Sequence, residues 1–143
     1  MFDTVELVVS GKIVYKKDLI GGSDLEKCLL PYMSPRDFIC PKVNFRSQMY
    51  CSGDIVVLEA YNQDEIKVGL VSTMLIRNEV VFFVIRQFLT RRTLLRYFKG
   101  SSVNQALSLF DSKNLADYKP LINQGTSSHV IFCLHHHLSA GFD

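Results

Sequence analysis

The stretch from Ser52 to Gly100 constrains the fold most, because it holds three or four runs of β-forming residues separated by short polar turns. The predicted strands are Asp54 to Tyr61, Ile66 to Ile76 and Glu79 to Phe88. Consecutive strands with short turns are typical of antiparallel sandwiches and barrels. Parallel sheets need long crossovers, and only Leu19 to Asn44 is long enough to supply one. We therefore predict a mainly β fold, a small antiparallel barrel or sandwich with one or two short helices.

The run from Glu79 to Phe88 is apolar on both faces. Side chains alternate along a strand, so Phe82 and Phe83 point to opposite faces, each among aliphatic neighbours. A strand that is apolar on both faces must be covered on both. We predict that it is the central strand and that Phe82 and Phe83 are both buried. In the preceding strand, Gly69 indicates a bulge or a sharp bend.

We predict that residues 1–143 form a single β-rich interaction domain, because no linker rich in Gly and Ser divides the chain. Residues 1–18 alternate around Ser10-Gly11, which predicts a β-hairpin. Residues 19–49 are predicted to be a connecting excursion with one or two helical turns: Ser23 to Glu26 has the pattern of a capping box, and Ser34 to Asp37 could cap a second turn. Residues 50–138 are predicted to hold the central sheet.

The pattern after Phe88 allows two interpretations. A turn at Thr90 to Thr93 could lead into a fourth strand, Leu94 to Lys99; alternatively, Thr90 to Phe98 forms a helix, because Arg and Leu are good helix formers. Further on, we expect a short strand at Ala106 to Phe110, a helical turn or loop at Asp111 to Leu121, and a closing strand at His129 to Leu138.

Composition limits the classes of function. A net charge of +2 excludes a polycation wrapped around nucleic acid, so any such contact needs a local patch. The longest apolar run, Val80 to Ile85, has six residues, whereas a membrane-spanning helix needs about 20. The N-terminus lacks the basic region of a signal peptide. The cysteines form no CxxC pair, so we expect reduced thiols in a nuclear or cytoplasmic protein that is not secreted: Cys28, Cys40, Cys51 and Cys133.

The histidine-rich C-terminal run could contribute to a zinc site, because Cys133, His135 and His137 would share one strand face. Residues two apart on a strand lie roughly 7 Å apart, so they converge on one ion only with distortion and a further ligand. We therefore predict no metal and no cofactor, with a zinc-dependent enzyme as a remote alternative. The sequence also lacks GxSxG, HExxH and a phosphate-binding glycine loop, which favours a non-enzymatic protein.

The segment from Val80 to Phe110 contains no acidic residue and is rich in arginine. Arginine binds phosphate or carboxylate in a bidentate manner, and aromatic rings stack on bases. The alternative is a solvated strand-turn-strand whose arginine stems cover apolar surface. The candidate residues for binding a protein partner or nucleic acid are Arg86, Arg91, Arg92, Arg96, Tyr97 and Lys99.

Three short motifs, Gly53 to Leu58, Val68 to Val71 and Val80 to Val84, resemble the opening strands of BAH-type and other small chromatin-reader barrels. Leu115 to Leu121 is similar to the C-terminal region of transposon-related animal proteins. The resemblance implies a nuclear, non-enzymatic interaction module. Our first expectation is a protein-binding domain of a chromatin- or transposon-associated protein, and the alternative is a nucleic-acid-binding β-barrel that uses the basic segment from Arg86 to Lys99.

Overall fold

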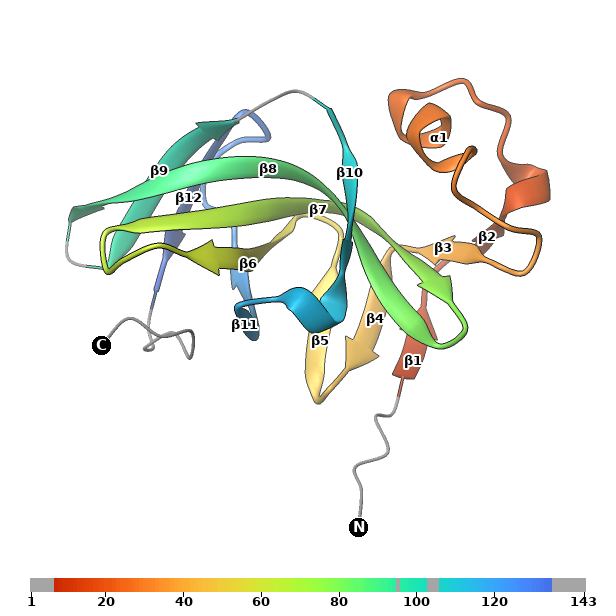
Figure 1. Cartoon of the computed structure of the whole chain (residues 1–143), viewed down its shortest axis with the longest axis horizontal. Helices are drawn as coiled ribbons and strands as arrows, with labels where there is room; N and C mark the ends of the chain where they lie inside the picture. Colours follow the sequence, from red (N-terminus) through yellow and green to blue (C-terminus); the bar gives the residue numbers. More distant parts are fainter. Residues whose placement is uncertain (1–6, 95, 103–105, 135–143) are drawn as a thin grey trace, which may run out of the picture.

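Two antiparallel sheets make up most of the molecule (Figure 1), in a computed structural model that describes residues 7–94, 96–102 and 106–134. The smaller sheet has the order β1 (Leu7–Ser10), β4 (Lys42–Phe45), β5 (Gln48–Cys51). The main path of the larger sheet is β11 (Asp117–Ile122), β6 (Asp54–Ala60), β7 (Glu65–Arg77), β8 (Val80–Leu94), β9 (Tyr97–Ser102), β12 (His129–Cys133). Off this path, β10 (Ser108–Asp111) pairs with β8, and β3 (Phe38–Cys40) pairs with β7 and β2 (Val14–Tyr15). The fold is mainly β and sandwich-like without being a closed barrel, which confirms the predicted class.

The long hairpin β7–β8 forms the two central strands of the larger sheet. Its turn is formed by Asn78 and Glu79, whose φ angles of 50° and 65° suit a tight two-residue hairpin. The hairpin divides in two next to a register shift between Val71 and Thr73. The proximal half, residues 71–85, includes the turn and pairs outward with β3 and β10. The distal half, residues 65–70 and 86–94, pairs outward with β6 and β9.

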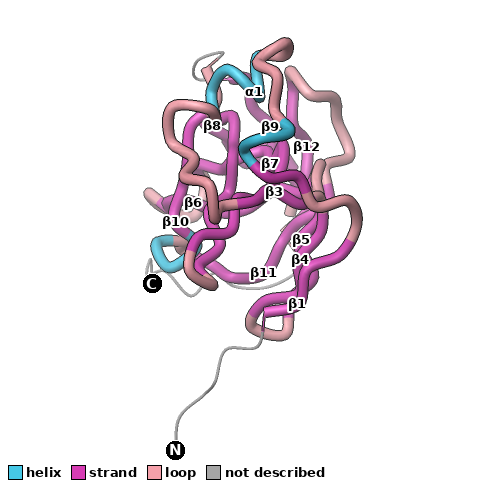
Figure 2. Tube along the Cα trace, turned by 90° about the vertical axis from the view of Figure 1, so that its right-hand side faces the viewer, coloured by secondary structure: helices cyan, strands magenta, loops and turns pink. Residues whose placement is uncertain are grey.

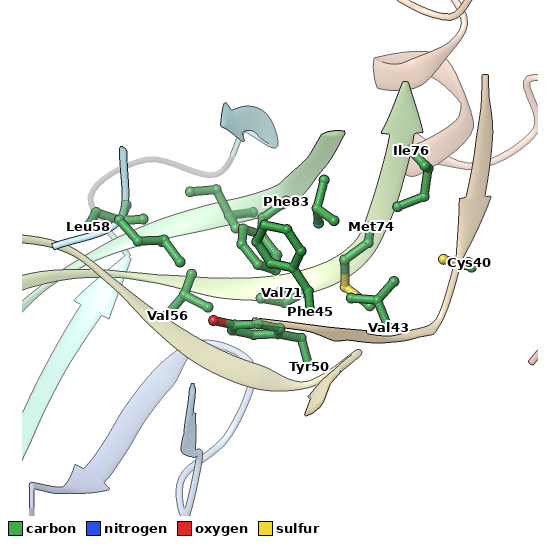
Figure 3. Close-up of a cluster of buried hydrophobic side chains, with 13 residues drawn as sticks. Cys40, Val43, Phe45, Tyr50, Val56, Leu58, Val71, Met74, Ile76 and Phe83 are labelled. Atoms are coloured by element: carbon green, nitrogen blue, oxygen red, sulfur yellow. The ribbon is translucent and has the colours of Figure 1, made fainter. Parts of the chain in front are cut away.

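Both faces of the proximal half are covered. The smaller sheet covers one face, where the Phe83 ring is fully buried and lies 5.1 Å from the Tyr50 ring centroid (Figure 3). The single α-helix among the described residues, α1 (Asp24–Leu29), covers the other face, so α1 and the smaller sheet lie on opposite sides of β7 (Figure 2). The structure thus confirms the two-sided burial of this strand. The prediction that Phe82 is buried is wrong: it is only half-buried and packs at the edge of the core beneath α1, with the Arg77 guanidinium carbon 5.8 Å from its ring centroid.

The distal half contributes only one face to a core. That core collects apolar side chains from β6, β7, β8, β9, β11 and β12, and its Phe98 and Phe132 rings stack with centroids 5.5 Å apart. The sheet curls around it until its two edge strands, β11 and β12, come close together. Between them, the Gln124 N–H donates to the Ile131 carbonyl at 2.7 Å. The opposite face of the distal half belongs to the surface described below.

The predicted hairpin at residues 1–18 is wrong, because its two strands belong to different sheets. Strand β1 pairs with β4, whereas β2 pairs with β3. Gly11 turns the chain with a φ of 84°, and a Cβ added there would lie 2.6 Å from Cγ of Pro41. The chain therefore turns at a close crossing over Pro41 and leaves the first sheet instead of folding back on it. A 3-10 turn, η1 (Lys16–Asp18), follows β2.

The predicted excursion of residues 19–49 is confirmed for its helix and corrected for its strands. The capping box is present: the Glu26 N–H donates to the Ser23 hydroxyl oxygen, and the Glu26 carboxylate accepts from the Ser23 N–H. The turn at Ser34 to Asp37 also forms. The segment nevertheless contains β3, β4 and the start of β5, because Ile39, Val43 and Phe45 are needed to cover the hairpin.

Two interpretations of the chain after Phe88 are corrected. The turn at Thr90 to Thr93 and the alternative helix are both wrong, because β8 continues to Leu94, paired with β7 as far as Arg91 and with β9 beyond it. The buried Thr90 hydroxyl donates to the Ile66 carbonyl at 2.8 Å. The helical turn or loop predicted at Asp111 to Leu121 is confirmed for its first part by the 3-10 turn η2 (Ser112–Asn114) and corrected for the rest, because β11 follows and pairs with β6. Strands β10 and β12 lie where strands were predicted, and residues beyond Leu134 lie outside the described ranges.

Candidate functional site

The candidate site is the face of the distal half that points away from its core, here called the outer face. Strand register places its side chains in three cross-strand rows that run over β7, β8, β9 and β12. None of the three buried clusters found among the described residues includes a side chain of this face. The rows are Lys67, Leu89, Ser101 and His129; Glu65, Arg91, Lys99 and Ile131; and Tyr97 and Cys133.

Two apolar side chains stand exposed on the outer face. Leu89 is 47% exposed and Tyr97 is 42% exposed, and Leu94 at the end of β8 is 71% exposed. Exposed aromatic and aliphatic groups surrounded by polar ones are typical of surfaces that bind partners, since water is a poor environment for both. The outer face therefore carries an exposed apolar side chain in its first row and another in its third, with the charged row of Arg91 and Lys99 between them.

Acidic side chains from the turn between β6 and β7 neutralise part of the basic segment. Arg91 Nη2 lies 2.9 Å from Glu65 Oε2, and Arg92 Nε lies 3.4 Å from Asp64 Oδ1. Hydrogen bonds from Asn62 and Arg91 lower the pKa of the Glu65 carboxyl, so it is ionised at neutral pH. The basic segment contains no acidic residue in its own sequence. In the fold, Asp64 and Glu65 lie beside it, because β7 pairs with β8.

The structure brings three of the six predicted site residues together and separates the others. Arg91, Tyr97 and Lys99 share the outer face, because their positions alternate in phase on paired strands. Arg92 points to the core side, where its guanidinium carbon lies 5.7 Å from the centroid of the Phe98 ring.

The remaining two candidates lie at the ends of this region. Arg96 is exposed in the connection between β8 and β9, where its carbonyl accepts a hydrogen bond from the Leu134 N–H at 2.8 Å. Arg86 is half-buried and lines a separate groove of about 720 Å³ between α1 and β10. Neither side chain can be counted with the outer face.

The ionisable groups with shifted pKa values serve structural contacts. Burial raises the pKa of the Cys40 thiol to about 11 and also raises that of Cys28, so neither is an activated thiolate at neutral pH. Burial also raises the pKa of Tyr50, whose hydroxyl donates to the Tyr118 carbonyl. Asp37 is buried against Arg77. These groups lie in different parts of the fold and form no catalytic constellation.

The described ranges contain no group of three His, Cys, Asp or Glu side chains placed to hold a metal ion. His135 and His137 of the proposed zinc trio lie outside those ranges, and Cys133 is half-buried on the outer face. Within the described part of the chain, no helix has the length and apolar character needed to cross a membrane.

Sequence reasoning did not propose seven members of the outer face as partner-binding residues, although it considered Cys133 as a zinc ligand: Glu65, Lys67, Leu89, Ser101, His129, Ile131 and Cys133. Lys67 and Leu89 each lie between two buried residues, so side-chain alternation marks them as outward-facing once the strand is recognised. Their assembly into one row depends on the register between strands. Short-range sequence patterns do not specify this register, particularly where β8 continues through the segment predicted to be a turn.

No family model, curated protein or solved structure matches this chain.

Proposed function

We propose that this chain is a non-catalytic protein-interaction module and that its outer face contacts the partner. One observation carries the proposal: the same hairpin is covered on both faces in its proximal half and on one face only in its distal half. The uncovered face carries Leu89 and Tyr97, each more than 40% exposed. Burial of apolar area contributes about 25 cal/mol per Å², so a partner that covers these side chains is stabilised by removing them from water.

The charges of the outer face favour a partner that presents both acidic and apolar groups. Lys67, Arg91 and Lys99 are basic, whereas Glu65 is the one acidic side chain in the rows defined above. Complementary charge at the rim of an interface mainly raises the association rate and the specificity. We place this module on chromatin- or transposon-associated machinery of the nucleus; the motifs that resemble chromatin-reader barrels support that setting.

A second candidate function is nucleic-acid binding by the same face. The observation that favours it is the position of Tyr97 beside the basic side chains of Arg91 and Lys99, which would allow base stacking next to phosphate contacts. The ion pairs with Glu65 and Asp64 disfavour it, because those carboxylates repel phosphates.

The two functions differ in what charge variants do to duplex binding. If the face binds nucleic acid, Arg91→Ala/Lys99→Ala weakens binding of random duplex DNA and flattens the salt slope by roughly 0.9 per lost contact. Glu65→Gln then strengthens binding, because it removes the carboxylate paired with Arg91. If the face binds protein, fluorescence anisotropy shows no saturable duplex binding near physiological salt for any of these proteins.

The decisive experiment compares affinity capture by wild type, by an outer-face variant and by a matched control. The outer-face variant is Leu89→Asp/Tyr97→Asp. The control is Val8→Asp/Met49→Asp, because Val8 and Met49 are 48% and 43% exposed and flank Asn44 on the other sheet. Both variants thus place two carboxylates on similarly exposed strand positions.

We expect a set of proteins captured by wild type and by the control from nuclease-treated nuclear extract, and lost with the outer-face variant. Equal capture by all three proteins contradicts the proposal. Capture that disappears on nuclease treatment supports the nucleic-acid function instead.

A further inference from the structure

A pocket of about 600 Å³ lies between η1 and the segment that follows α1. Tyr15, Lys16 and Lys17 line one side, and Leu30 and Pro35 line the other. Pockets that bind ligands commonly measure about 300–1,000 Å³, which here is room for two or three side chains. The α1 and β2 region lies at the opposite end of the molecule from β9 and β12 (Figure 1), so the pocket is separate from the outer face.

Hydrogen bonds fix the wall that carries Leu30 and Pro35. The Arg77 guanidinium donates to Asp37 Oδ2 from Nη2 at 2.7 Å and from Nε at 3.0 Å, and also donates to the Tyr32 carbonyl. Asp37, which is 2% exposed, also accepts from the Ser34 N–H at 2.9 Å. Strand β7 thereby anchors the chain on both sides of Ser34.

The other wall is fixed by aromatic packing. The Tyr15 ring contacts Phe38 of the paired strand β3 with 5.6 Å between ring centroids. Side chains held in this way lose little freedom when a ligand binds, which reduces the entropic cost of binding. The pocket is therefore largely pre-formed.

Charge and polarity indicate the ligand. The lining contains two lysines and no acidic residue, and neither lysine forms an ion pair with a described residue. The rest of the lining is an aromatic ring, a leucine and a proline. Ile20 and Tyr32, close in the chain to the lining residues, are 87% and 60% exposed. A ligand that matches this surface carries carboxylates beside apolar side chains.

We propose that this pocket binds a short acidic peptide segment of a partner protein, with one or two apolar side chains seated between Tyr15 and Leu30 and with carboxylates next to Lys16 and Lys17. It is a second site, and it does not depend on the function proposed for the outer face.

The test uses a defined set of labelled hexapeptides, Asp-Glu-X-X-Asp-Glu, in which each X is Leu, Ile, Val, Met, Phe or Tyr. Fluorescence anisotropy with the full chain measures binding. Two matched sets serve as controls, one with Lys-Arg flanks and one with Ser at both X positions. We expect saturable binding of acidic members, weakened at least tenfold with basic flanks and at least fivefold without apolar residues.

Variants locate the binding. Lys16→Glu/Lys17→Glu should weaken binding of the best acidic peptide at least tenfold, and Lys16→Gln/Lys17→Gln should give an intermediate loss. Lys42→Glu/Lys119→Glu changes two exposed lysines on other strands by the same charge and should stay within twofold of wild type. Circular dichroism melting confirms that each variant is folded.

The proposal is overturned if no acidic member binds saturably, or if the control pair loses as much affinity as the pocket pair. Leu89→Asp/Tyr97→Asp should bind the peptides as wild type does. Loss of peptide binding in that variant, with retention in the pocket variants, would place the peptide on the outer face and would refute the second site alone.

Discussion

The proximal and distal halves of the β7–β8 hairpin are made by the same two strands, yet they have different surroundings. In the proximal half, Val81 and Phe83 face the smaller sheet while Phe82 and Val84 face α1. In the distal half, Phe88 and Thr90 face a core, whereas Leu89 and Arg91 are exposed. The change follows the sequence of β8, which is apolar at every position up to Ile85 and mostly polar afterwards. A single long strand can thus provide both the stability of the fold and its candidate binding surface.

The largest expected effect is in the proximal half. Phe83→Ala should lower the free energy of unfolding by about 3–5 kcal/mol, because it leaves a cavity beside Tyr50 that the surrounding sheets cannot fill. Leu89→Ala in the distal half should change it by no more than about 0.5 kcal/mol. Urea denaturation of both variants measures the difference; equal losses would show that the two halves are equally buried.

The next prediction compares ion pairs from the two halves. Arg77→Met leaves the buried Asp37 carboxylate without its main partner and should cost about 1–3 kcal/mol. Glu65→Gln removes an exposed partner of Arg91 and should have little effect. Denaturation curves that shift equally for both variants would contradict the assignment of Asp37 to a buried contact.

The Asp37 contact also predicts a pH dependence. Burial by itself raises the pKa of this carboxyl, but hydrogen bonds from Arg77 and Ser34 outweigh burial, so the pKa is lowered on folding. A lowered pKa stabilises the fold above the unfolded value of about 4, and that stabilisation is lost as the pH falls through the folded value. The stability difference between wild type and Asp37→Asn should therefore be larger at pH 7 than at pH 3. A difference that grows toward pH 3 would reverse the assigned sign.

Gly69 tests the boundary between the two halves. The sequence predicts a bulge or a sharp bend at Gly69, but the register shift between β7 and β8 lies between Val71 and Thr73. A Cβ added at Gly69 would lie 2.8 Å from Cδ1 of Ile85. Gly69→Ala should cost about 1–3 kcal/mol through overpacking. Gly22→Ala, where the added Cβ would meet nothing closer than 3.7 Å, is the matched control. Equal stabilities of the two variants would show that the contact with Ile85 relaxes freely.

The smallest expected effect is in the outer face itself. Leu89→Asp and Tyr97→Asp should each change the free energy of unfolding by no more than about 0.5 kcal/mol, because neither side chain belongs to a core. Thermal melts of the single variants check this. A loss above about 2 kcal/mol would mean that these side chains stabilise the fold. Loss of a partner in the capture experiment would then be explained by unfolding of the variant.

Local patterns predict much of this fold. Runs of β-forming residues between polar turns predict β6 and most of β7, the apolar run predicts the doubly covered start of β8, and Ser23 with Glu26 predicts α1. Pairing between distant strands is not encoded locally. The alternating runs on either side of Gly11 suit a hairpin, but the close crossing at Pro41 sends them to different sheets.

The candidate site is harder to predict than the fold. Arginine content marks the correct region of β8 and β9, but it does not show that Arg92 points inward or that Glu65 lies beside Arg91. Both facts depend on cross-strand register, as does the meeting of Leu89 and Tyr97 on one face. Strand β11 is not predicted, because Pro120 interrupts its sequence pattern. A proline is tolerated there because β11 is an edge strand and Pro120 lies at the register shift between Asp117 and Leu121.

Site-specific photo-crosslinking tests the central claim most directly, namely that the uncovered face of the distal half is where a protein partner binds. The photoreactive residue p-benzoylphenylalanine replaces Leu89 in one protein and Val8, of equal exposure, in another. After irradiation in nuclease-treated nuclear extract, we predict a discrete protein adduct from position 89 and none of that mass from position 8. The same adducts from both positions, or no protein adduct from position 89, would contradict the claim.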